Sequence, residues 1–336
     1  MNITVFSTKL YDKRSFLAAV SQRTDAAHLH WHWLQDTLST HTARFAKGSS
    51  AVCCFVNDTL DADCLQELAH HGVKLVCLRC AGFNQVDLVA AKHHDIQVVR
   101  VPEYSPHSVA EHTVGLMVML NRHLHKAYNR VREGNFSLEG LLGIDFHGLT
   151  AGVIGTGKIG CCVISILQGF GCNVLAFDPK PRTSLEKKGV RYCSMDDLLQ
   201  QSSIVTLHCP LSDASYHLIN KHRIEKMQHG VMLINTSRGG LIDTKAVIHG
   251  LKVGQIGSLG LDVYEEEASL FFEDKSSSII QDDTFMRLLT FPNVVVTGHQ
   301  AFFTRNAFEA IADHTVENLV RFSKNEPLKA TISAQT

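Results

Sequence analysis

The sequence predicts an α/β protein of two domains, each with a parallel β-sheet covered by helices. Three observations support this fold class. The chain has 336 residues, about twice the usual ~150 residues of one domain. Short apolar runs alternate with helical patterns, as expected for parallel strands buried on both faces. A glycine-rich segment, residues 155–160, follows one apolar run and precedes a helical pattern, which is typical of a doubly wound sheet.

Composition and charge exclude several classes of protein. The formal net charge is -1, so no general attraction to nucleic acid or to an anionic membrane is expected. Apolar residues make up 45% of the chain, enough for a sizeable core. The most apolar helical stretch, residues 114–120, is far shorter than the ~20 residues that cross a bilayer. We expect a globular protein without a membrane span.

The N-terminus and the cysteines predict a cytoplasmic location. Lys9, Lys13 and Arg14 follow the apolar residues 3–6 rather than precede them, the reverse of a secretory signal. Adjacent cysteines at 53–54 and 161–162 lie in apolar runs, so we expect small buried thiols rather than disulfides.

The middle of the chain contains six candidate buried strands with helices between them. Ser194 followed by Asp197 resembles a capping box, and Asp243 can cap a helix that stops near Gly254. The expected strands are residues 151–154, 173–177, 204–207, 231–234, 257–261 and 294–296.

The first hundred residues predict a second, smaller α/β unit. A helix is expected from Ser105-Pro106 to about His125, because Pro favours the first helical position. Residues 305–323 form an amphipathic pattern that could rejoin the first unit. We therefore expect a discontinuous domain of residues 1–103 and 302–336, and a continuous domain of residues 104–301. The expected strands of the smaller unit are residues 3–6, 52–56, 73–78 and 98–101.

No metal site is predicted. Cys77 and Cys80 have a redox or metal-ligand spacing, but no second pair accompanies them. In residues 28–33 three histidines alternate with Leu29, Trp31 and Trp33, which favours a half-buried strand with a solvated histidine face over a metal-binding tract.

The segment G-T-G-K-I-G, residues 155–160, indicates a dinucleotide site. Gly155 permits a tight turn, Gly157 lets a pyrophosphate approach the backbone, and Gly160 allows close packing of the helix. Asp178 ends the next strand, 18 residues after Gly160, where a carboxylate accepts hydrogen bonds from an adenosine ribose. This carboxylate repels a 2′-phosphate and thus favours NAD over NADP. The sequence predicts a Rossmann-like NAD-binding domain.

Polar residues follow three later strands, at the sheet edge where such folds place their reactions. Arg238 follows residues 231–234 in a turn of small residues where a compact carboxylate substrate could approach. Residues 262–267 include four acids, and His299 follows the last strand. Since a carboxylate fixes the tautomer of a neighbouring imidazole and favours its protonated form, these predict an acid-base pair. The pattern alone does not choose among Glu265, Glu266 and Glu267.

Several motifs together resemble the D-isomer-specific 2-hydroxyacid dehydrogenase family, and within it the bacterial fermentative lactate-type enzymes. The cofactor motif with Asp178 is followed by N-T-S-R-G-G, G-L-D-V-Y-E-E-E and T-G-H-Q-A-F in the family's order. F-S-T-K-L-Y-D, L-R-C-A-G-F-N, R-V-P-E-Y-S-P, N-F-S-L-E-G and F-F-E-D-K-S extend the similarity over essentially the whole chain.

The resemblance implies two Rossmann-like domains, with a doubly wound sheet in the NAD domain and a smaller flavodoxin-like substrate domain. It implies that Arg238 binds the substrate carboxylate and that His299 exchanges the proton. Glu267 is implied as the partner of His299 by the family's five-residue separation from Asp262. Implied substrate contacts are Ala81, Gly82, Tyr104, Arg238 and Phe302. Implied cofactor contacts are Gly155, Gly157, Lys158, Ile159, Gly160, Asp178, Cys209, Pro210, Ser215, Thr236, Ser237, Arg238 and Asp262.

The expected activity is reversible reduction of pyruvate to D-lactate by hydride transfer from NADH. One alternative is a dehydrogenase for another D-2-hydroxy acid, with a branched-chain keto acid, glyoxylate or hydroxypyruvate as substrate. Another is a catalytically idle NAD-sensing protein, although such a sensor needs none of Arg238, Glu267 and His299. A homo-oligomer is also expected, either a dimer or a tetramer joined through the NAD domain.

Overall fold

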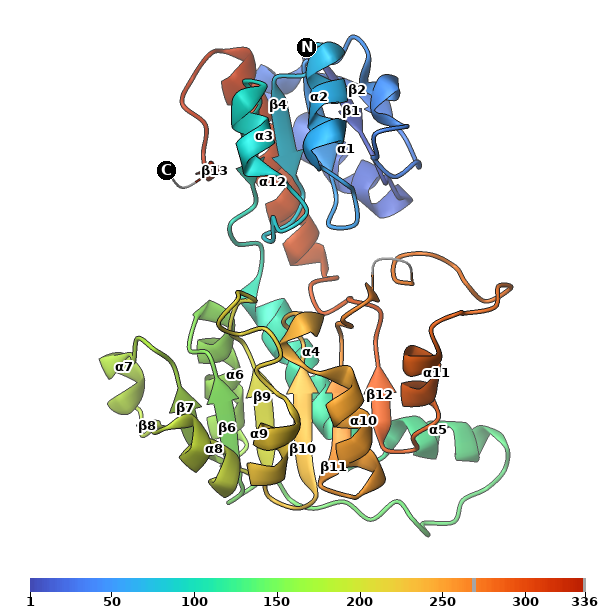
Figure 1. Ribbon diagram of the computed structural model, residues 1–336, viewed down its shortest axis with the longest axis vertical. Helices are drawn as coiled ribbons and strands as arrows, with labels where there is room; N and C mark the ends of the chain where they lie inside the picture. The colour runs from blue at the N-terminus through green and yellow to red at the C-terminus, as the bar shows by residue number, and fades with distance from the viewer. Residues whose placement is uncertain (268–269, 335–336) are drawn as a thin grey trace. The chain divides into compact units, whose positions relative to one another are not determined.

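The computed structural model describes residues 1–267 and 270–334. The chain divides into two compact units, each with one β-sheet flanked by helices (Figure 1). Unit 1 comprises Met1–Ser105 and Phe303–Thr336, and unit 2 comprises Pro106–Phe302. Two predominantly parallel sheets with helical layers confirm the predicted α/β class.

Unit 1 has a flavodoxin-like sheet in the order β13-β5-β4-β3-β1-β2. All neighbouring strands are parallel except β13, which pairs antiparallel with β5. The strands are β1 (Asn2–Val5), β2 (His30–Trp33), β3 (Ala51–Cys54), β4 (Leu75–Leu78), β5 (Gln97–Arg100) and β13 (Thr331–Ile332). The helices are α1 (Leu10–Ser21), α2 (Ala62–His70), α3 (Leu88–His93) and α12 (Arg305–Ser323), with 3₁₀ turns η1 (Thr24–Ala26) and η2 (Ala43–Ala46).

Alternate residues of the unit 1 strands enter two different cores. Cys53 and Cys77 pack with α1 and with α12, whereas Val52 and Val76 pack with α2 and α3 on the opposite face. The C-terminal helix α12 therefore completes one core of the unit that the N-terminal residues begin.

Unit 2 has an all-parallel sheet in the order β12-β11-β10-β9-β6-β7-β8. This is the doubly wound Rossmann order with one strand added at an edge. The strands are β6 (Thr150–Ile154), β7 (Asn173–Phe177), β8 (Arg191–Tyr192), β9 (Ile204–Leu207), β10 (Val231–Asn235), β11 (Ile256–Leu261) and β12 (Val294–Val296). The helices are α4 (Pro106–Asn121), α5 (Leu124–Arg132), α6 (Lys158–Gly169), α7 (Thr183–Glu186), α8 (Met195–Gln201), α9 (Lys221–Lys226), α10 (Thr244–Lys252) and α11 (Asp283–Leu289), with the 3₁₀ turn η3 (Gly239–Leu241).

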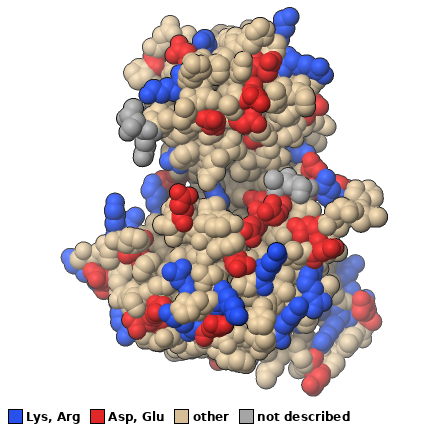
Figure 2. All heavy atoms as spheres, in the orientation of Figure 1, with Lys and Arg blue, Asp and Glu red and all other residues tan. Residues whose placement is uncertain are grey.

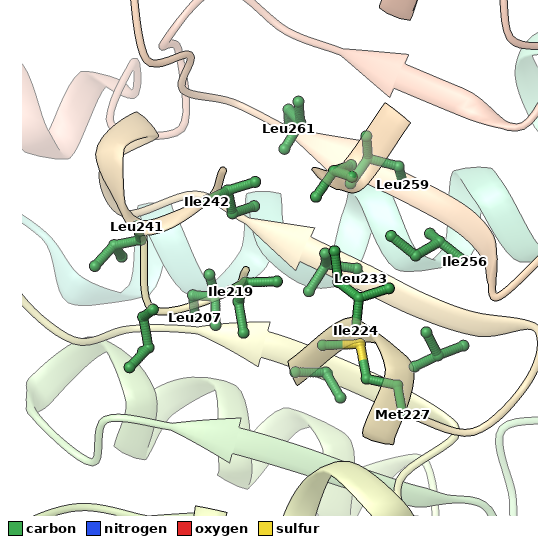
Figure 3. Close-up of a cluster of buried hydrophobic side chains, with 14 of the residues drawn as sticks. Leu207, Ile219, Ile224, Met227, Leu233, Leu241, Ile242, Ile256, Leu259 and Leu261 are labelled. Atoms are coloured by element: carbon green, nitrogen blue, oxygen red, sulfur yellow. The ribbon is translucent and has the colours of Figure 1, made fainter. Parts of the chain in front are cut away.

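Helices cover both faces of the unit 2 sheet. Met232 and Ile234 of β10 pack on the side of α4 and α6. Leu233 points to the other side, where it joins a cluster with residues of α8, α9, α10 and α11. Figure 3 shows this cluster, in which Leu259 is the in-register neighbour of Leu233 and Leu207 lies beside Ile219. Because the strands are buried on both faces, we expect polar functional side chains in the loops that follow the carboxyl ends of the strands.

Most predicted elements are confirmed, with three local exceptions. The six expected strands of the second domain correspond to β6, β7 and β9–β12. The two-residue strands β8 in unit 2 and β13 in unit 1 were missed. The helix expected to reach about His125 ends at Asn121, because His123 adopts a left-handed conformation (φ 49°) and a separate helix, α5, follows. Residues 30–33 form strand β2 with the histidines on its exposed side, as expected.

Surface charge is mixed, as the near-zero net charge implies. On the face drawn in Figure 2, Lys and Arg side chains are interspersed with Asp and Glu on each unit. Among the helices of the described residues, none combines the length and the apolar character that a bilayer span requires.

Two glycines bring α6 close to the end of β6. Gly155 has φ +94°, and a Cβ there would lie 2.6 Å from the backbone of His208 and of Cys209. A Cβ on Gly160 would lie 2.1 Å from the carbonyl oxygen of Gly155. Glycine at these two positions lets the first turn of α6 pack directly against backbone at the ends of β6 and β9. This packing determines the direction of the N-terminus of α6.

We expect Gly160→Ala to lower the free energy of unfolding of unit 2 by about 1–3 kcal/mol, because the added methyl overlaps backbone that cannot move aside. Gly169→Ala, in the last position of the same helix, is the matched control: its Cβ meets nothing within 4 Å. This control should be neutral or stabilise by up to about 1 kcal/mol. Chemical denaturation of both variants makes the comparison, and equal stability of the two would contradict the packing role.

Candidate active site

A cavity of about 580 Å³ opens at the carboxyl ends of β6, β7 and β9 in unit 2. It lies where the strand order reverses, the usual ligand position in an open α/β sheet. Six of the predicted cofactor residues line it: Gly155, Gly157, Asp178, Cys209, Pro210 and Ser215.

The N-terminus of α6 has the features that a dinucleotide requires. Gly157 is its N-cap residue, and a Cβ on Gly157 would meet no atom within 4 Å, so the backbone is open to a ligand. Lys158, Ile159 and Gly160 form the first turn of this helix, where backbone N–H groups favour an anion. The residues present therefore fit a pyrophosphate.

Asp178 is held in place by the same turn. Its Oδ2 accepts hydrogen bonds from the Thr156 N–H (2.7 Å) and from Thr156 Oγ1 (3.0 Å), and its Oδ1 accepts from the Lys180 N–H (2.8 Å). Burial raises the pKa of Asp178, but these hydrogen bonds outweigh it and hold the pKa below its usual value. A carboxylate ionised throughout the neutral range thus lines the cavity, which suits a ribose hydroxyl and repels a phosphate.

Several residues that line the cavity are not among the predicted cofactor contacts, and His208 is the most informative of them. His208 comes directly after β9, so the strand-end rule used for Arg238 and His299 could have found it. Burial lowers the pKa of His208 to about 3, and its Nε2 lies 2.9 Å from Thr206 Oγ1. The neighbouring Cys209 thiol has its pKa raised to about 11, also by burial. Both side chains are neutral, so the cavity wall here carries no charge.

Arg238 follows β10 in a turn that the buried side chain of Asn235 organises. Asn235 Nδ2 donates to the Arg238 carbonyl oxygen (2.8 Å), and Asn235 Oδ1 accepts from the Ser237 N–H (3.0 Å). Ser237 Oγ donates to the Cys209 carbonyl oxygen (2.9 Å), and Thr236 Oγ1 lies 2.7 Å from Thr113 Oγ1. The guanidinium of Arg238 is partly buried and donates to the Ser237 carbonyl oxygen (2.7 Å).

Gly239, the residue after Arg238, also has a packing role that the sequence did not reveal. A Cβ on Gly239 would lie 2.1–2.4 Å from the backbone of Tyr264 and Glu265. Gly239 therefore lets the turn that carries Arg238 pack directly against the segment that leads to Glu267. The expected approach of a compact substrate to this turn stays a prediction.

His299 and Glu267 lie in contact. His299 Nδ1 is 2.8 Å from Glu267 Oε1, and Glu267 Oε2 accepts from the Tyr264 N–H (2.9 Å). Because an ionised carboxylate only accepts hydrogen bonds, Nδ1 carries the proton that it donates, and Nε2 faces away from this partner. The rings of Phe272 and Phe302 lie 5.6 and 6.5 Å from the imidazole. The arrangement is an oriented histidine with apolar neighbours, as general acid-base chemistry requires.

The other two acids of the E-E-E run have different surroundings. Glu265 Oε1 lies 2.6 Å from His217 Nε2 and accepts from the Tyr216 hydroxyl (3.1 Å), while Glu265 Oε2 accepts from Thr244 Oγ1 (3.1 Å). Glu266 is exposed. Three consecutive acids thus have three separate environments, a distinction that sequence periodicity could not supply.

Asp262 is fully buried between the ends of β11 and β12. It accepts hydrogen bonds from Thr297 Oγ1 (2.6 Å) and from the N–H groups of Gln300 and Ala301 (2.8 Å each), and it pairs with His112 Nε2 at 3.4 Å. Burial raises the pKa of this carboxyl, but the hydrogen bonds outweigh it and lower the pKa. Asp262 therefore anchors the loop on both sides of His299, and its expected cofactor contact remains a prediction.

The remaining predicted substrate residues belong to different parts of the chain. Ala81 and Gly82 lie in the loop after β4, and Tyr104 lies near the end of the first segment of unit 1. Phe302 is the last residue of unit 2 and is buried. Their contacts with a substrate remain predictions.

Comparison with known proteins identifies similar chains along the whole length. Residues 114–301 match the family model described as the NAD binding domain of D-isomer specific 2-hydroxyacid dehydrogenases. The D-lactate dehydrogenase of Escherichia coli is 50% identical over 326 residues, which cover 97% of this chain and 98% of that protein.

Solved structures give the same result. The structure of the pyruvate reductase of Chlamydomonas reinhardtii has a TM-score of 0.92 at 46% identity and 98% coverage of both chains. The D-lactate dehydrogenase of Aquifex aeolicus, complexed with NAD and lactic acid, has a TM-score of 0.85 at 33% identity, with 97% of this chain and 96% of that chain covered.

We expect Asp262→Asn to lower the free energy of unfolding at pH 7 by about 1–3 kcal/mol, since an amide NH₂ group would face donors on every side. The depressed pKa stabilises the folded state above the unfolded-state value near 3.8, and this contribution disappears as pH falls through the folded-state pKa. The difference between the wild type and the variant should therefore shrink as the pH drops below about 4.

Denaturant unfolding at a series of pH values measures this difference. Asp213→Asn, at an exposed carboxyl of the same unit, is the control and should change the stability little. A stability difference for Asp262→Asn that stays constant down to the lowest pH would contradict the anchoring role of the ionised carboxylate.

Proposed function

The chain belongs to the D-isomer-specific 2-hydroxyacid dehydrogenase family, and we propose that it reduces pyruvate to D-lactate reversibly with NADH. The contact between His299 and Glu267 in unit 2 is the observation that supports catalysis most directly. A protein that only senses NAD does not need an oriented acid-base pair.

His299 is proposed to exchange the substrate proton at Nε2. In the direction of reduction, the protonated imidazole donates this proton to the keto oxygen; in oxidation, the neutral ring removes the hydroxyl proton. Glu267 accepts the Nδ1 hydrogen bond in both states and so keeps the ring oriented.

Arg238 is proposed to bind the substrate carboxylate. A guanidinium can give a carboxylate two parallel charge-assisted hydrogen bonds, which fixes the orientation of a small substrate. Ala81, Gly82 and Tyr104 of unit 1 are proposed as further substrate contacts, with Phe302 near the substrate methyl group. Unit 1 would then form the substrate domain and unit 2 the NAD-binding domain. The bounds of these units lie one or two residues from the expected domains of residues 1–103 with 302–336 and of residues 104–301.

NADH, when bound, supplies the hydride. Gly155, Gly157, Lys158, Ile159 and Gly160 would hold its pyrophosphate and Asp178 its adenosine ribose. The proposed further contacts are Cys209, Pro210, Ser215, Thr236, Ser237, Arg238 and Asp262. The cavity with its neutral wall at His208 and Cys209 supports this placement of the cofactor.

The experiment that tests the proposal follows NADH absorbance with pyruvate, glyoxylate, hydroxypyruvate and a branched-chain 2-keto acid, and determines the chirality of the product. We expect the largest kcat/KM for pyruvate and D-lactate as the product. His299→Asn should lower kcat about 10²- to 10⁴-fold, the range for loss of an acid-base residue, while NADH binding is retained.

His222→Asn, at an exposed histidine on α9 of the same unit, is the matched control and should leave kcat unchanged. A higher kcat/KM for another keto acid would reassign the substrate. Binding of NADH without turnover of any keto acid would favour the sensor, and wild-type turnover in His299→Asn would remove the role of that residue.

We also propose a homo-oligomer, on the basis of an apolar arm formed by residues 124–144 of unit 2. Helix α5 contains no buried residue in the single chain, and residues 131–140 are exposed without interruption. Leu138 and Leu142 are 82% and 92% exposed. The other large apolar side chains exposed on the arm are Leu124, Tyr128, Val131, Phe136 and Ile144. A second copy of the chain would cover this arm.

We expect the wild type to sediment as a dimer or a tetramer, and Phe136→Glu/Leu138→Glu to shift it toward the monomer, because burying two carboxylates opposes association. Val253→Glu replaces an exposed apolar residue away from the arm and should keep the wild-type assembly. Sedimentation equilibrium over a range of concentrations measures the mass, and a monomeric wild type would contradict the proposal.

A cytoplasmic location is proposed as well. All ten cysteines are free thiols, and most of them are buried. Free thiols in such number persist in a reducing compartment.

A further inference from the structure

The loop after β4 in unit 1 presents two adjacent backbone donors. Ala81 and Gly82 are both partly buried. Among the described residues, no protein acceptor receives a hydrogen bond from the N–H of Ala81 or of Gly82. N–H groups without a protein acceptor remain available to an oxygen of a bound anion.

Arg100 contacts the peptide unit that joins Ala81 to Gly82, at the carbonyl end of that unit. Its Nη1 donates to the Ala81 carbonyl oxygen at 2.7 Å, and its guanidinium lies 5.1 Å from the centre of the Phe83 ring. Arg100 is the last residue of β5, paired in register with Leu78, the last residue of β4. Two contacts and a strand end therefore hold this guanidinium against the loop.

Because the peptide is planar, the contact with Arg100 also determines the direction of the Gly82 N–H. In a trans peptide the C=O of Ala81 and the N–H of Gly82 point in opposite directions. Fixing the carbonyl oxygen with Arg100 therefore directs the Gly82 N–H away from Arg100. The positive charge also polarises the peptide, because a hydrogen bond to the carbonyl oxygen strengthens the donor at the other end of the same unit.

Further contacts keep the loop from rotating. Cys80 Sγ donates to the Gly82 carbonyl oxygen (3.2 Å), and the Val101 N–H donates to the Cys80 carbonyl oxygen (3.2 Å). The preceding residue, Arg79, is buried and pairs with Asp12 at 2.8 Å. The loop is thus fixed at both ends, and Arg100 is the cationic contact at its centre.

We propose that Arg100 is a positioning residue for the substrate carboxylate, which acts through the Ala81–Gly82 peptide. Arg100 orients and strengthens the Gly82 N–H that receives a carboxylate oxygen, and it adds positive charge behind that donor. This inference rests on the proposed function, since it assigns the anion to be bound as the carboxylate of a small 2-keto acid.

The test compares Arg100→Met with Arg100→Lys in the full-length protein. We measure kcat and KM for pyruvate, the inhibition constant of oxamate, a nonreacting isostere of pyruvate, and the Kd of NADH. Arg100→Met should raise the pyruvate KM and the oxamate constant about tenfold, the usual scale for losing one hydrogen bond to a charged group. The value of kcat should fall less than about threefold and the NADH Kd should not change, because the transferred proton lies with His299.

Arg100→Lys retains the charge and one donor, so it should return both constants to within about threefold of the wild type. Lys74→Met is the matched control: it removes one exposed cation directly before β4, at the opposite end of the strand, and should leave every constant unchanged. If Arg100→Met does not fold, Arg100→Gln serves in the same comparison.

An unchanged pyruvate KM and oxamate constant in folded Arg100→Met would overturn the inference, as would a loss confined to kcat or to thermal stability. A different result, a wild type that turns over no 2-keto acid, would contradict the proposed function rather than the role of Arg100. In that case calorimetric binding of oxamate to the NADH-loaded wild type and Arg100→Met still decides the role of Arg100. Equal affinity there would overturn it.

Discussion

The buried carboxylate of Asp262 is the interaction on which the geometry of the candidate site depends. It receives hydrogen bonds from Thr297, Gln300 and Ala301, and therefore joins the end of β11 to the loop that contains His299. An ionised group without solvent is stable only when donors surround it, so the loop has little freedom to rearrange. His299 itself has φ +53°, a conformation that few residues adopt without such support.

Close backbone approaches connect this centre to the rest of unit 2. Gly239 brings the turn of Arg238 against Tyr264 and Glu265, and the Tyr264 N–H in turn holds Glu267. Gly155 and Gly160 allow a similarly close backbone approach in the turn between β6 and α6. Main-chain contacts that tolerate no added Cβ thus set where the backbone of Arg238 and the turn of residues 155–160 lie.

The sequence predicted the large-scale architecture because burial imposes a strong pattern. Strands that are apolar on both faces, such as β10, and the amphipathic helix α12 were located almost residue by residue. The two-residue strands β8 and β13 were missed because such short segments have no periodicity. The break at His123 depends on one backbone conformation that composition does not reveal. Within the site, the resemblance rather than the pattern singled out Glu267, and the packing role of Gly239 required knowledge of which backbone lies opposite.

The discontinuity of unit 1 has a consequence for biosynthesis. Helix α12 provides Ala312, Val316, Leu319 and Val320 to a core whose other members come from the first hundred residues. While the ribosome is still translating, those early strands lack the helix that covers them, whereas unit 2 can complete its own core first. The segment synthesised first is therefore the last to mature, and it exposes apolar surface to chaperones and proteases until α12 has been synthesised and has packed against it.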